Sequence, residues 1–324
     1  MSLVRVELSR LLHRRAVVLL LVAAALLTAL VAGTTLWDTR PVGADELASA
    51  RAQVQEQVDS PGFEKQLAGC RADPAQLFGP GATGADCARQ LTPTEDSYLS
   101  RSPLSLDEQR DQGGTALIVV LTALMILLGA TFAGADWATG STGNRLLFEP
   151  RRAKVWVAKA VAVTLACLVA AALLLVAFWV SLYLVAESRG IATGATVQGQ
   201  VRWLAARGLA LAAMAGLGGY ALTMLLRSTV ATMALLFAYT AGGEVLLALA
   251  PVDRPGRWSP ANNVSAWIHD GVRVFDSHLP CGTAGGPCDQ HYTLGLLDSA
   301  AYLAVLLVLA VVVSLVLFRG RDVP

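Results

Sequence analysis

The fold class is decided by residues 155–186, which read VWVAKAVAVTLACLVAAALLLVAFWVSLYLVA. This stretch is apolar around its whole circumference and carries a single charge, Lys159. An α-helix rises about 1.5 Å per residue, so about 20 apolar residues cross a hydrocarbon core of about 30 Å. The stretch therefore predicts a membrane-spanning helix, and its surplus length predicts that the helix tilts or projects beyond the bilayer.

Five further stretches have the same apolar character: residues 115–135, 204–226, 229–250, 16–36 and 299–318. Across the 324 residues, 55% are hydrophobic and 15% are charged, whereas a soluble domain has about 25% charged residues. The first stretch follows basic residues, as in a signal peptide, but its apolar run is too long and more spans follow it. We predict an all-α membrane protein with six transmembrane helices in one transmembrane domain, residues 1–324.

The charges are sorted between the two sides of these spans. Eleven basic and four acidic residues occupy the segments that share one side when six spans alternate, namely residues 1–15, 136–154, 227 and 319–324. The loop 37–112 has thirteen acidic and seven basic residues. Because positive loops stay inside, both termini are predicted to be cytoplasmic, in the plasma membrane of a bacterium. Arg189, Arg202 and Arg207 depart from this pattern because they fall near a short outer loop.

Residues 37–114 and 251–298 are then extracytoplasmic segments, and each contains two cysteines. In the first we expect a solvated helix over 44–58 and a helical hairpin with a stapled loop. An oxidising exterior favours disulfides, which we predict between Cys70 and Cys87 and between Cys281 and Cys288. A tetrahedral zinc site remains the alternative for the second pair, because His278 and His291 flank it at ligand-like spacing.

Residues 2–15 are expected to form an interfacial helix. At 100° per residue an apolar cluster gathers on one side, made of Val4, Leu8, Leu11 and Leu12. Glu7, Arg10, His13 and Arg14 are expected to lie away from that side. The alternative is a basic flank that only sets the topology.

No familiar ATP-binding or catalytic motif occurs in the chain. The sequence contains no G-x-x-x-x-G-K-[ST] phosphate loop, no H-E-x-x-H and no G-x-S-x-G. Residues 216–219, Gly-Leu-Gly-Gly, lie inside an apolar span and indicate close helix packing. We therefore expect no catalytic residues, no metal and no cofactor of the chain's own.

Three charged residues fall inside the predicted spans: Lys159, Arg207 and Glu244. Such residues are costly in a bilayer and are functional candidates by default. Glu244 is a candidate for a transport path, and the alternative is a helix-pairing contact with Arg202 or Arg207. Lys159 lies near the inner end of its span and is expected to snorkel to the membrane surface without a role of its own.

The most informative stretch is residues 134–159, GADWATGSTGNRLLFEPRRAKVWVAK. Its ordered acidic, Gly-Ser, Leu-Leu, Pro, Arg and Lys positions resemble the first cytoplasmic loop of ABC-2 type exporter permeases, especially those of actinobacteria. The matching positions are Asp136, Gly140, Ser141, Leu146, Leu147, Pro150, Arg151 or Arg152, and Lys159. Asp136 stands where the family more often has Glu. The alternative is a generic positive-inside loop, which explains the arginines but not the ordered apolar and small residues.

The resemblance implies that residues 136–154 form a coupling loop, with a short helix that docks into a separate ATPase. Ser141 or Thr142 can cap a helix over 142–148, and Pro150 prevents its continuation. Its apolar residues, Leu146, Leu147 and Phe148, would fill a groove in the ATPase. Its basic neighbours, Arg145, Arg151 and Arg152, would fix the orientation.

The function implied by the resemblance is that of a permease subunit in an ABC exporter. Its partners would be cytoplasmic ATPase subunits holding ATP and Mg, a second copy or a homologous permease, and membrane lipids, with no nucleic acid. The substrate is not readable, although the apolar spans favour an amphipathic one. Two alternatives remain open: a membrane-embedded enzyme using Glu244 or the outer Cys/His loop, and a ligand-sensing scaffold.

Overall fold

The computed structural model describes residues 3–79, 82–99, 101, 104–141, 143, 150–249, 253–276 and 290–320. The chain divides into two compact units. The first, here called the bundle, comprises Met1–Ala32 and Leu106–Pro324. The second, here called the insert, comprises Gly33–Ser105. The calls on Cys281, Cys288, His278, Thr142, Arg145, Leu146, Leu147 and Phe148 lie outside the described residues.

Within the described residues, six helices are long and apolar enough to cross a membrane, which confirms the six predicted spans. These spans are α2 (Arg15–Asp38), α7 to α8 (Leu106–Ala138), α10 (Arg152–Ser188), α11 (Ala195–Leu226), the segment from α12 into α13 (Thr229–Leu247) and α15 (Leu296–Gly320). Inside lipid a helix satisfies its own backbone hydrogen bonds, so each apolar run folds as a helix regardless of its neighbours.

Two spans begin well before their apolar runs. α7 (Leu106–Gln109) and a π-helical turn, η2 (Arg110–Gly114), precede α8 (Thr115–Ala138). α11 begins at Ala195 rather than at residue 204. Both extensions are rich in polar and charged side chains, which hydropathy does not register as helix. These polar extensions line the cavity described below.

The α-helical geometry of the fifth span is interrupted by a π-helical turn near its middle. α12 (Thr229–Phe237) passes into a π-helical turn, η3 (Ala238–Gly242), and continues as α13 (Gly243–Leu249). The predicted end of this span, Ala250, lies outside the described residues. Thr232 is the buried residue of α12, so most of this helix faces outward from the bundle.

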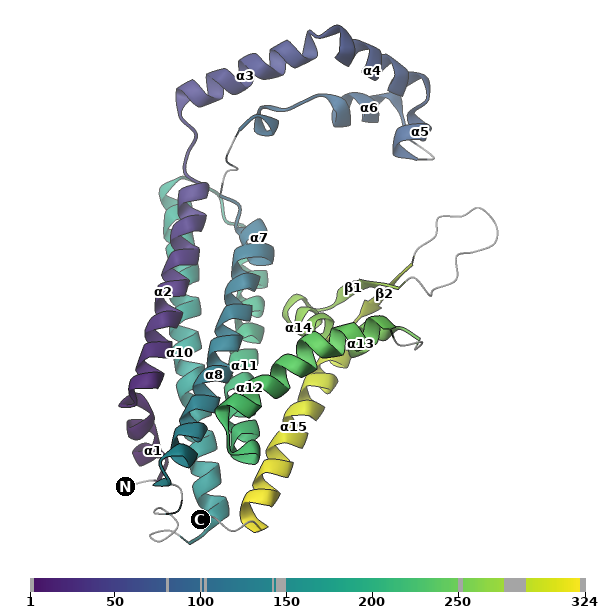
Figure 1. Ribbon diagram of the computed structural model, residues 1–324. Coiled ribbons are helices and arrows are strands. Elements are labelled where there is room, and N and C mark those ends of the chain that lie inside the picture. Colours follow the sequence, from purple (N-terminus) through teal and green to yellow (C-terminus); the bar gives the residue numbers. More distant parts are fainter. Residues whose placement is uncertain are drawn as a thin grey trace. The chain divides into compact units, whose positions relative to one another are not determined.

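α8 and α11 lie side by side with their backbones in direct contact (Figure 1). A Cβ atom added at Gly129 of α8 would lie 2.0 Å from the carbonyl oxygen of Gly216 in α11. A Cβ atom at Gly219 would lie 2.3 Å from the carbonyl oxygen of Ile126. The predicted packing role of residues 216–219 is therefore confirmed: small residues let two membrane helices approach closely.

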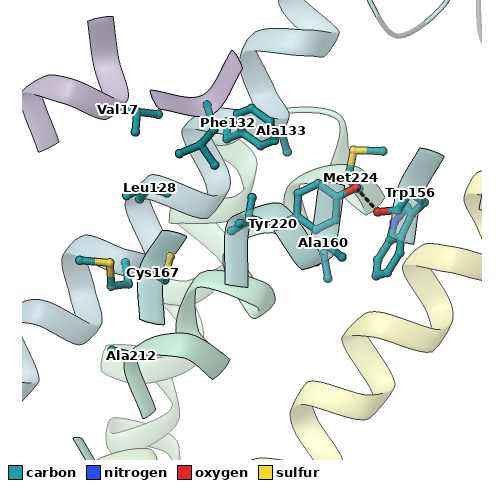
Figure 2. Close-up of a cluster of buried hydrophobic side chains, with 14 of the residues drawn as sticks. Val17, Leu128, Phe132, Ala133, Trp156, Ala160, Cys167, Ala212, Tyr220 and Met224 are labelled. Atoms are coloured by element: carbon teal, nitrogen blue, oxygen red, sulfur yellow. Dashed lines mark hydrogen bonds between the residues drawn. The ribbon is translucent and has the colours of Figure 1, made fainter. Parts of the chain in front are cut away.

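The core of the bundle lies where α8, α10 and α11 meet (Figure 2). Leu128 and Phe132 of α8, with Cys167 of α10, are buried in it. Tyr220 of α11 is also fully buried, and its hydroxyl donates to the carbonyl oxygen of Trp156, 3.0 Å away. This bond satisfies the one polar atom that the tyrosine brings into an apolar site.

α1 (Leu3–Leu12) is a helix, as predicted, and it packs against α10. Leu11 is fully buried, in agreement with the predicted apolar side. The expectation for Glu7 is wrong, because its side chain is buried as well. Packing on a neighbouring helix, and not only on lipid, decides which side of so short a helix is covered. The interfacial position stays a prediction.

A small mixed element of short helices and two strands separates the last two spans. It contains η4 (Pro255–Trp258), α14 (Pro260–His269) and two strands, β1 (Val272–Phe275) and β2 (His291–Leu294). The strands pair antiparallel, with Val272 opposite Leu294. The all-α reading did not predict this hairpin, because four residues are too few to show a strand period.

The insert folds from four short helices, α3 (Ala44–Val58), α4 (Pro61–Ala72), α5 (Pro74–Phe78) and α6 (Gly84–Leu91), followed by a 3-10 turn, η1 (Glu95–Ser97). The predicted helix over 44–58 is confirmed. The predicted disulfide between Cys70 and Cys87 is also confirmed, with the two Cα atoms 5.9 Å apart and both side chains buried. A disulfide bond therefore cross-links α4 and α6 within the insert.

Candidate functional site

A buried carboxylate, Asp136, marks the candidate site at the end of α8. Its side chain is completely shielded from solvent. The ammonium of Lys159 on α10 and the guanidinium of Arg14, at the junction of α1 and α2, both form ion pairs with it. The hydroxyl of Ser141 donates to the carboxylate oxygen Oδ1 at 2.9 Å. We call Asp136, Lys159, Arg14 and Ser141 the Asp136 cluster.

Arg14 joins the N-terminal helices to α8 by more than one contact. Its second nitrogen donates to the carbonyl oxygen of Phe132 at 3.0 Å. The guanidinium also lies 5.0 Å from the centroid of the Phe132 ring. Arg14 was not predicted as a site residue, because in the sequence it is one of several arginines that set topology.

The expectation that Lys159 snorkels to the membrane surface is wrong. Its side chain is buried inside the bundle and paired with Asp136. Snorkelling requires a route to the membrane surface, whereas a buried ammonium is tolerated when a carboxylate and hydrogen bonds compensate it. The cluster holds one carboxylate and two cations, so it carries a net positive charge.

Several residues of the ordered motif meet in this cluster. Asp136, Ser141 and Lys159 are brought together, although 23 positions separate the first from the last. Gly140 has a φ of +65°, a conformation that glycine adopts readily, and the turn lets Ser141 reach back to the carboxylate. Pro150 and Arg151 precede α10, and Arg152 is its first residue.

Aromatic contacts extend the same end of the bundle. The guanidinium of Arg227, in the tight link between α11 and α12, lies 4.8 Å from the centroid of the Trp137 ring. Trp137 also meets Phe318 of α15 edge to face, with centroids 6.4 Å apart. Four spans are therefore connected around the last turn of α8.

Glu244 has partners other than those that the sequence suggested. Its carboxylate accepts from the hydroxyl of Ser259 at 2.5 Å and from the backbone N–H of Ala261 at 3.3 Å. These groups belong to the start of α14. Arg207 pairs with Asp270 at 3.0 Å instead. Glu244 thus connects α13 to the start of α14 through hydrogen bonds. Its position in a transport path stays a prediction.

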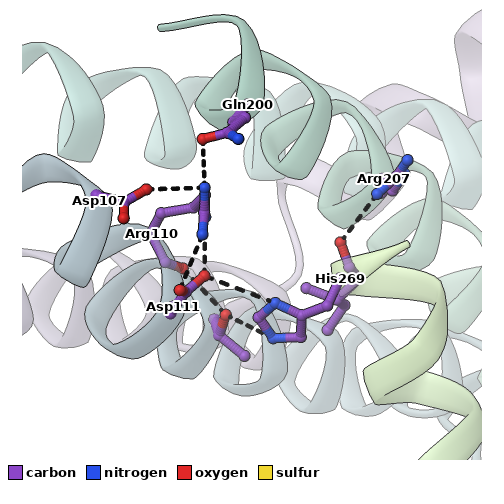
Figure 3. A network of polar contacts seen from close by, with 8 residues as sticks. Asp107, Arg110, Asp111, Gln200, Arg207 and His269 are labelled. Carbon is purple, nitrogen blue, oxygen red and sulfur yellow. Dashed lines mark hydrogen bonds and ion pairs between the residues drawn. The ribbon is translucent and has the colours of Figure 1, made fainter. Parts of the chain in front are cut away.

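A second site lies at the other end of α8, where η2, α11 and α14 surround a cavity of about 800 Å³. Figure 3 shows its polar wall. Arg110 forms a two-point ion pair with Asp111, at 2.8 and 2.9 Å, and pairs with Asp107 at 2.9 Å. No sequence motif marks this site; its one signal was the group of arginines on the predicted outer side.

His269 of α14 closes one side of this wall. Its Nε2 atom lies 3.2 Å from the hydroxyl oxygen of Thr115, and its Nδ1 atom lies 3.9 Å from a carboxylate oxygen of Asp111. Burial lowers the pKa of the His269 imidazole, an effect that the nearby Asp111 opposes. The imidazole is therefore neutral at pH 7.

The chain matches no known family model, no curated protein and no solved structure. Among the residues that the structure describes, no three His, Cys, Asp or Glu side chains gather in a way that could hold a metal ion. His291 lies in β2, where its ring meets Phe275 with centroids 5.5 Å apart.

Proposed function

We propose that this chain is the membrane-spanning permease subunit of an ABC exporter. It moves its substrate across a bacterial plasma membrane, driven by ATP hydrolysis in separate cytoplasmic ATPase subunits. Two copies, or this chain with a homologous permease, form the transport path. The Asp136 cluster is the observation that carries the proposal, because three residues of the ABC-2-like motif converge on one buried network.

The cluster suits a role in transmitting force. The loop 136–154 begins at the end of α8 and ends at the start of α10. Asp136 and Lys159 link those two helices directly, and Arg14 adds the junction of α1 and α2. A push on the loop is thereby transmitted to α8, α10 and the junction of α1 and α2 together, since packed and ion-paired elements move as units between discrete arrangements.

The loop supplies what an ATPase needs to engage. Leu146, Leu147 and Phe148 are an apolar group in a stretch that the charge pattern assigns to the cytoplasm. Apolar side chains in such a loop call for a covering partner. The chain itself has no phosphate-binding loop, so in this proposal a second protein hydrolyses the ATP.

The proposal is tested by purifying the tagged full-length chain from its native membranes in a mild detergent. An ABC ATPase, identified by its own peptide sequences, should copurify in stoichiometric amounts and hydrolyse Mg-ATP. The double variant Leu146→Asp, Leu147→Asp should abolish that copurification, because two carboxylates would be desolvated in the contact.

A matched control places two carboxylates on the insert, by Gln76→Asp and Leu77→Asp, where both side chains are exposed on α5. This control should leave copurification unchanged. Parent-level recovery of the ATPase with the loop variant would contradict the coupling role. Purification without any ABC ATPase would contradict the permease assignment and favour a sensor or an enzyme.

The proposal also requires the loop and both termini to face the cytoplasm. Single cysteines placed at Ser2 and at Ser97 should react with a membrane-impermeant maleimide from opposite sides. Labelling of both sites from outside would contradict this topology.

A further inference from the structure

The cavity at the start of α8 is a half-open space with polar and apolar walls, separate from the Asp136 cluster. Its volume of about 800 Å³ falls within the range of small-molecule sites, about 300–1,000 Å³. Arg110 and Asp136 are 26 positions apart along the α7–α8 span, which corresponds to about 39 Å of helix. The two sites therefore lie at opposite ends of the same helix.

Both arginines in the wall are already occupied by the protein. Arg110 donates to Asp111 through two nitrogens, and its third nitrogen contacts both Asp107 and Gln200. Arg207 pairs with Asp270 and also donates to the carbonyl oxygen of Ile268 at 3.4 Å. Each guanidinium side chain is less than one-fifth exposed. An anionic ligand would have to displace these carboxylates.

The carboxylates themselves are open to the solvent. The side chains of Asp107, Asp111 and Asp270 are 59%, 50% and 60% exposed. A carboxylate has about four lone-pair positions, so each retains accepting capacity beyond its arginine. Asp111 and Asp270 line the cavity together with Arg110, Arg207 and a neutral His269, so the lining has no net charge, but its two carboxylates are far more exposed than its two guanidiniums. The accessible polar surface therefore favours a positive ligand.

The remaining wall is aromatic and aliphatic. Trp203 of α11 is about two-thirds exposed, at 68%, and Trp267 of α14 is fixed by its indole N–H, which donates to the Arg207 carbonyl oxygen at 3.0 Å. Leu204 and Leu296 complete the apolar surface. Tryptophan faces attract organic cations, and apolar walls bury the body of such a ligand.

From these walls we propose that the cavity binds an amphipathic organic cation, with the positive group at Asp111 and Asp270 and the apolar body against Trp203 and Trp267. The binding site does not depend on the exporter assignment, because it follows from the cavity alone. Binding and transport are consequently tested by separate measurements.

The test uses tetraphenylphosphonium, a permanent cation with an apolar body, and tetraphenylborate, an anion of nearly the same size and shape. Each ion is titrated separately against the full-length chain in lipid nanodiscs, and empty nanodiscs correct for partitioning into lipid. The cation should bind saturably, and at least about tenfold more tightly than the anion, because the exposed charges of the wall are the carboxylates of Asp111 and Asp270.

Two variants locate the binding. Asp270→Asn removes the charge but keeps a residue that accepts the left-handed backbone found there, with φ +68°. Trp203→Ala removes the exposed indole. Each should raise the Kd for the cation about fivefold or more. Asp298→Asn is the matched control, because that carboxylate is half exposed and pairs with Arg257 at 3.1 Å outside the cavity.

Thermal unfolding and size-exclusion profiles establish that each variant is folded. An unchanged Kd in Trp203→Ala and Asp270→Asn, or saturable binding of the anion as tight as that of the cation, would overturn the proposal. If one variant does not fold, the other variant and the comparison of the two ions still decide the outcome.

Discussion

Asp136→Asn is the most informative single change, because it removes one negative charge and almost no volume from the Asp136 cluster. The asparagine can still accept a hydrogen bond from Ser141. It cannot compensate the charge on Lys159, whose side chain is buried, or on Arg14. The change therefore isolates the electrostatic part of the contact.

The expected loss in the free energy of unfolding follows from burial. Removing one partner of a buried ion pair costs about 3–5 kcal/mol, because it leaves an uncompensated charge in a low dielectric. Lys159 loses its ion pair with Asp136 in this variant. Arg14 is 20% exposed, so its charge can turn toward water and adds at most about 1 kcal/mol. We expect a total loss of about 3–5 kcal/mol.

A second change distinguishes charge from packing. Lys159→Met keeps the length of the side chain and removes its charge, while Asp136 retains Arg14 as a partner. Combining it with Asp136→Asn should recover much of the lost stability, because the stranded ammonium is gone. A double-mutant cycle over the two positions should give a coupling of about 2–3 kcal/mol.

The measurement is equilibrium unfolding of the purified chain in mixed micelles, with tryptophan fluorescence and far-ultraviolet circular dichroism as independent probes. Asp298→Asn serves as the control, since its exposed pair with Arg257 should contribute no more than about 1 kcal/mol. A loss below about 1 kcal/mol for Asp136→Asn, with no coupling to Lys159, would refute the reasoning.

Three further predictions concern the packing of α8 on α11, the disulfide of the insert and the partly buried His269. Gly129→Ala should prevent normal folding of the bundle, because the added Cβ atom would lie 2.0 Å from a carbonyl oxygen of α11. The measurement is loss of the monodisperse peak in size-exclusion chromatography. Gly33→Ala is the control and should be tolerated, because nothing lies within 4 Å of a Cβ atom added there. Replacing Cys70 and Cys87 by serine should destabilise the insert by about 3 kcal/mol, the value expected for a disulfide that closes a loop of 17 residues. Limited proteolysis should then cleave the insert. Equal protease resistance of parent and variant would contradict this. The pKa of His269 is lower in the folded state than in the unfolded state. The contribution of its neutral imidazole to stability is therefore present above about pH 6.5 and is lost as the pH falls through the folded pKa. The melting temperature should drop more between pH 7.5 and 5 in the parent than in His269→Gln.

Much of the architecture follows from local features of the chain. Each apolar run predicted a span, because a helix in lipid satisfies its own backbone and needs no information from its neighbours. Glycines 216 and 219 predicted close packing for a similar reason, since only a missing side chain permits backbone contact. The Cys70–Cys87 pair was readable from its shared segment.

Only the tertiary structure decided the partners of the charged residues. Arg14 and Asp136 are 122 positions apart, and nothing in the sequence distinguishes Arg14 from the other basic residues of its flank. The surface position expected for Lys159 was wrong, and the cavity around Arg110 was not predicted, because both depend on which faces of neighbouring helices meet. Hydrophobicity acts on each helix by itself, whereas a buried charge selects its partner through the packing of the whole bundle.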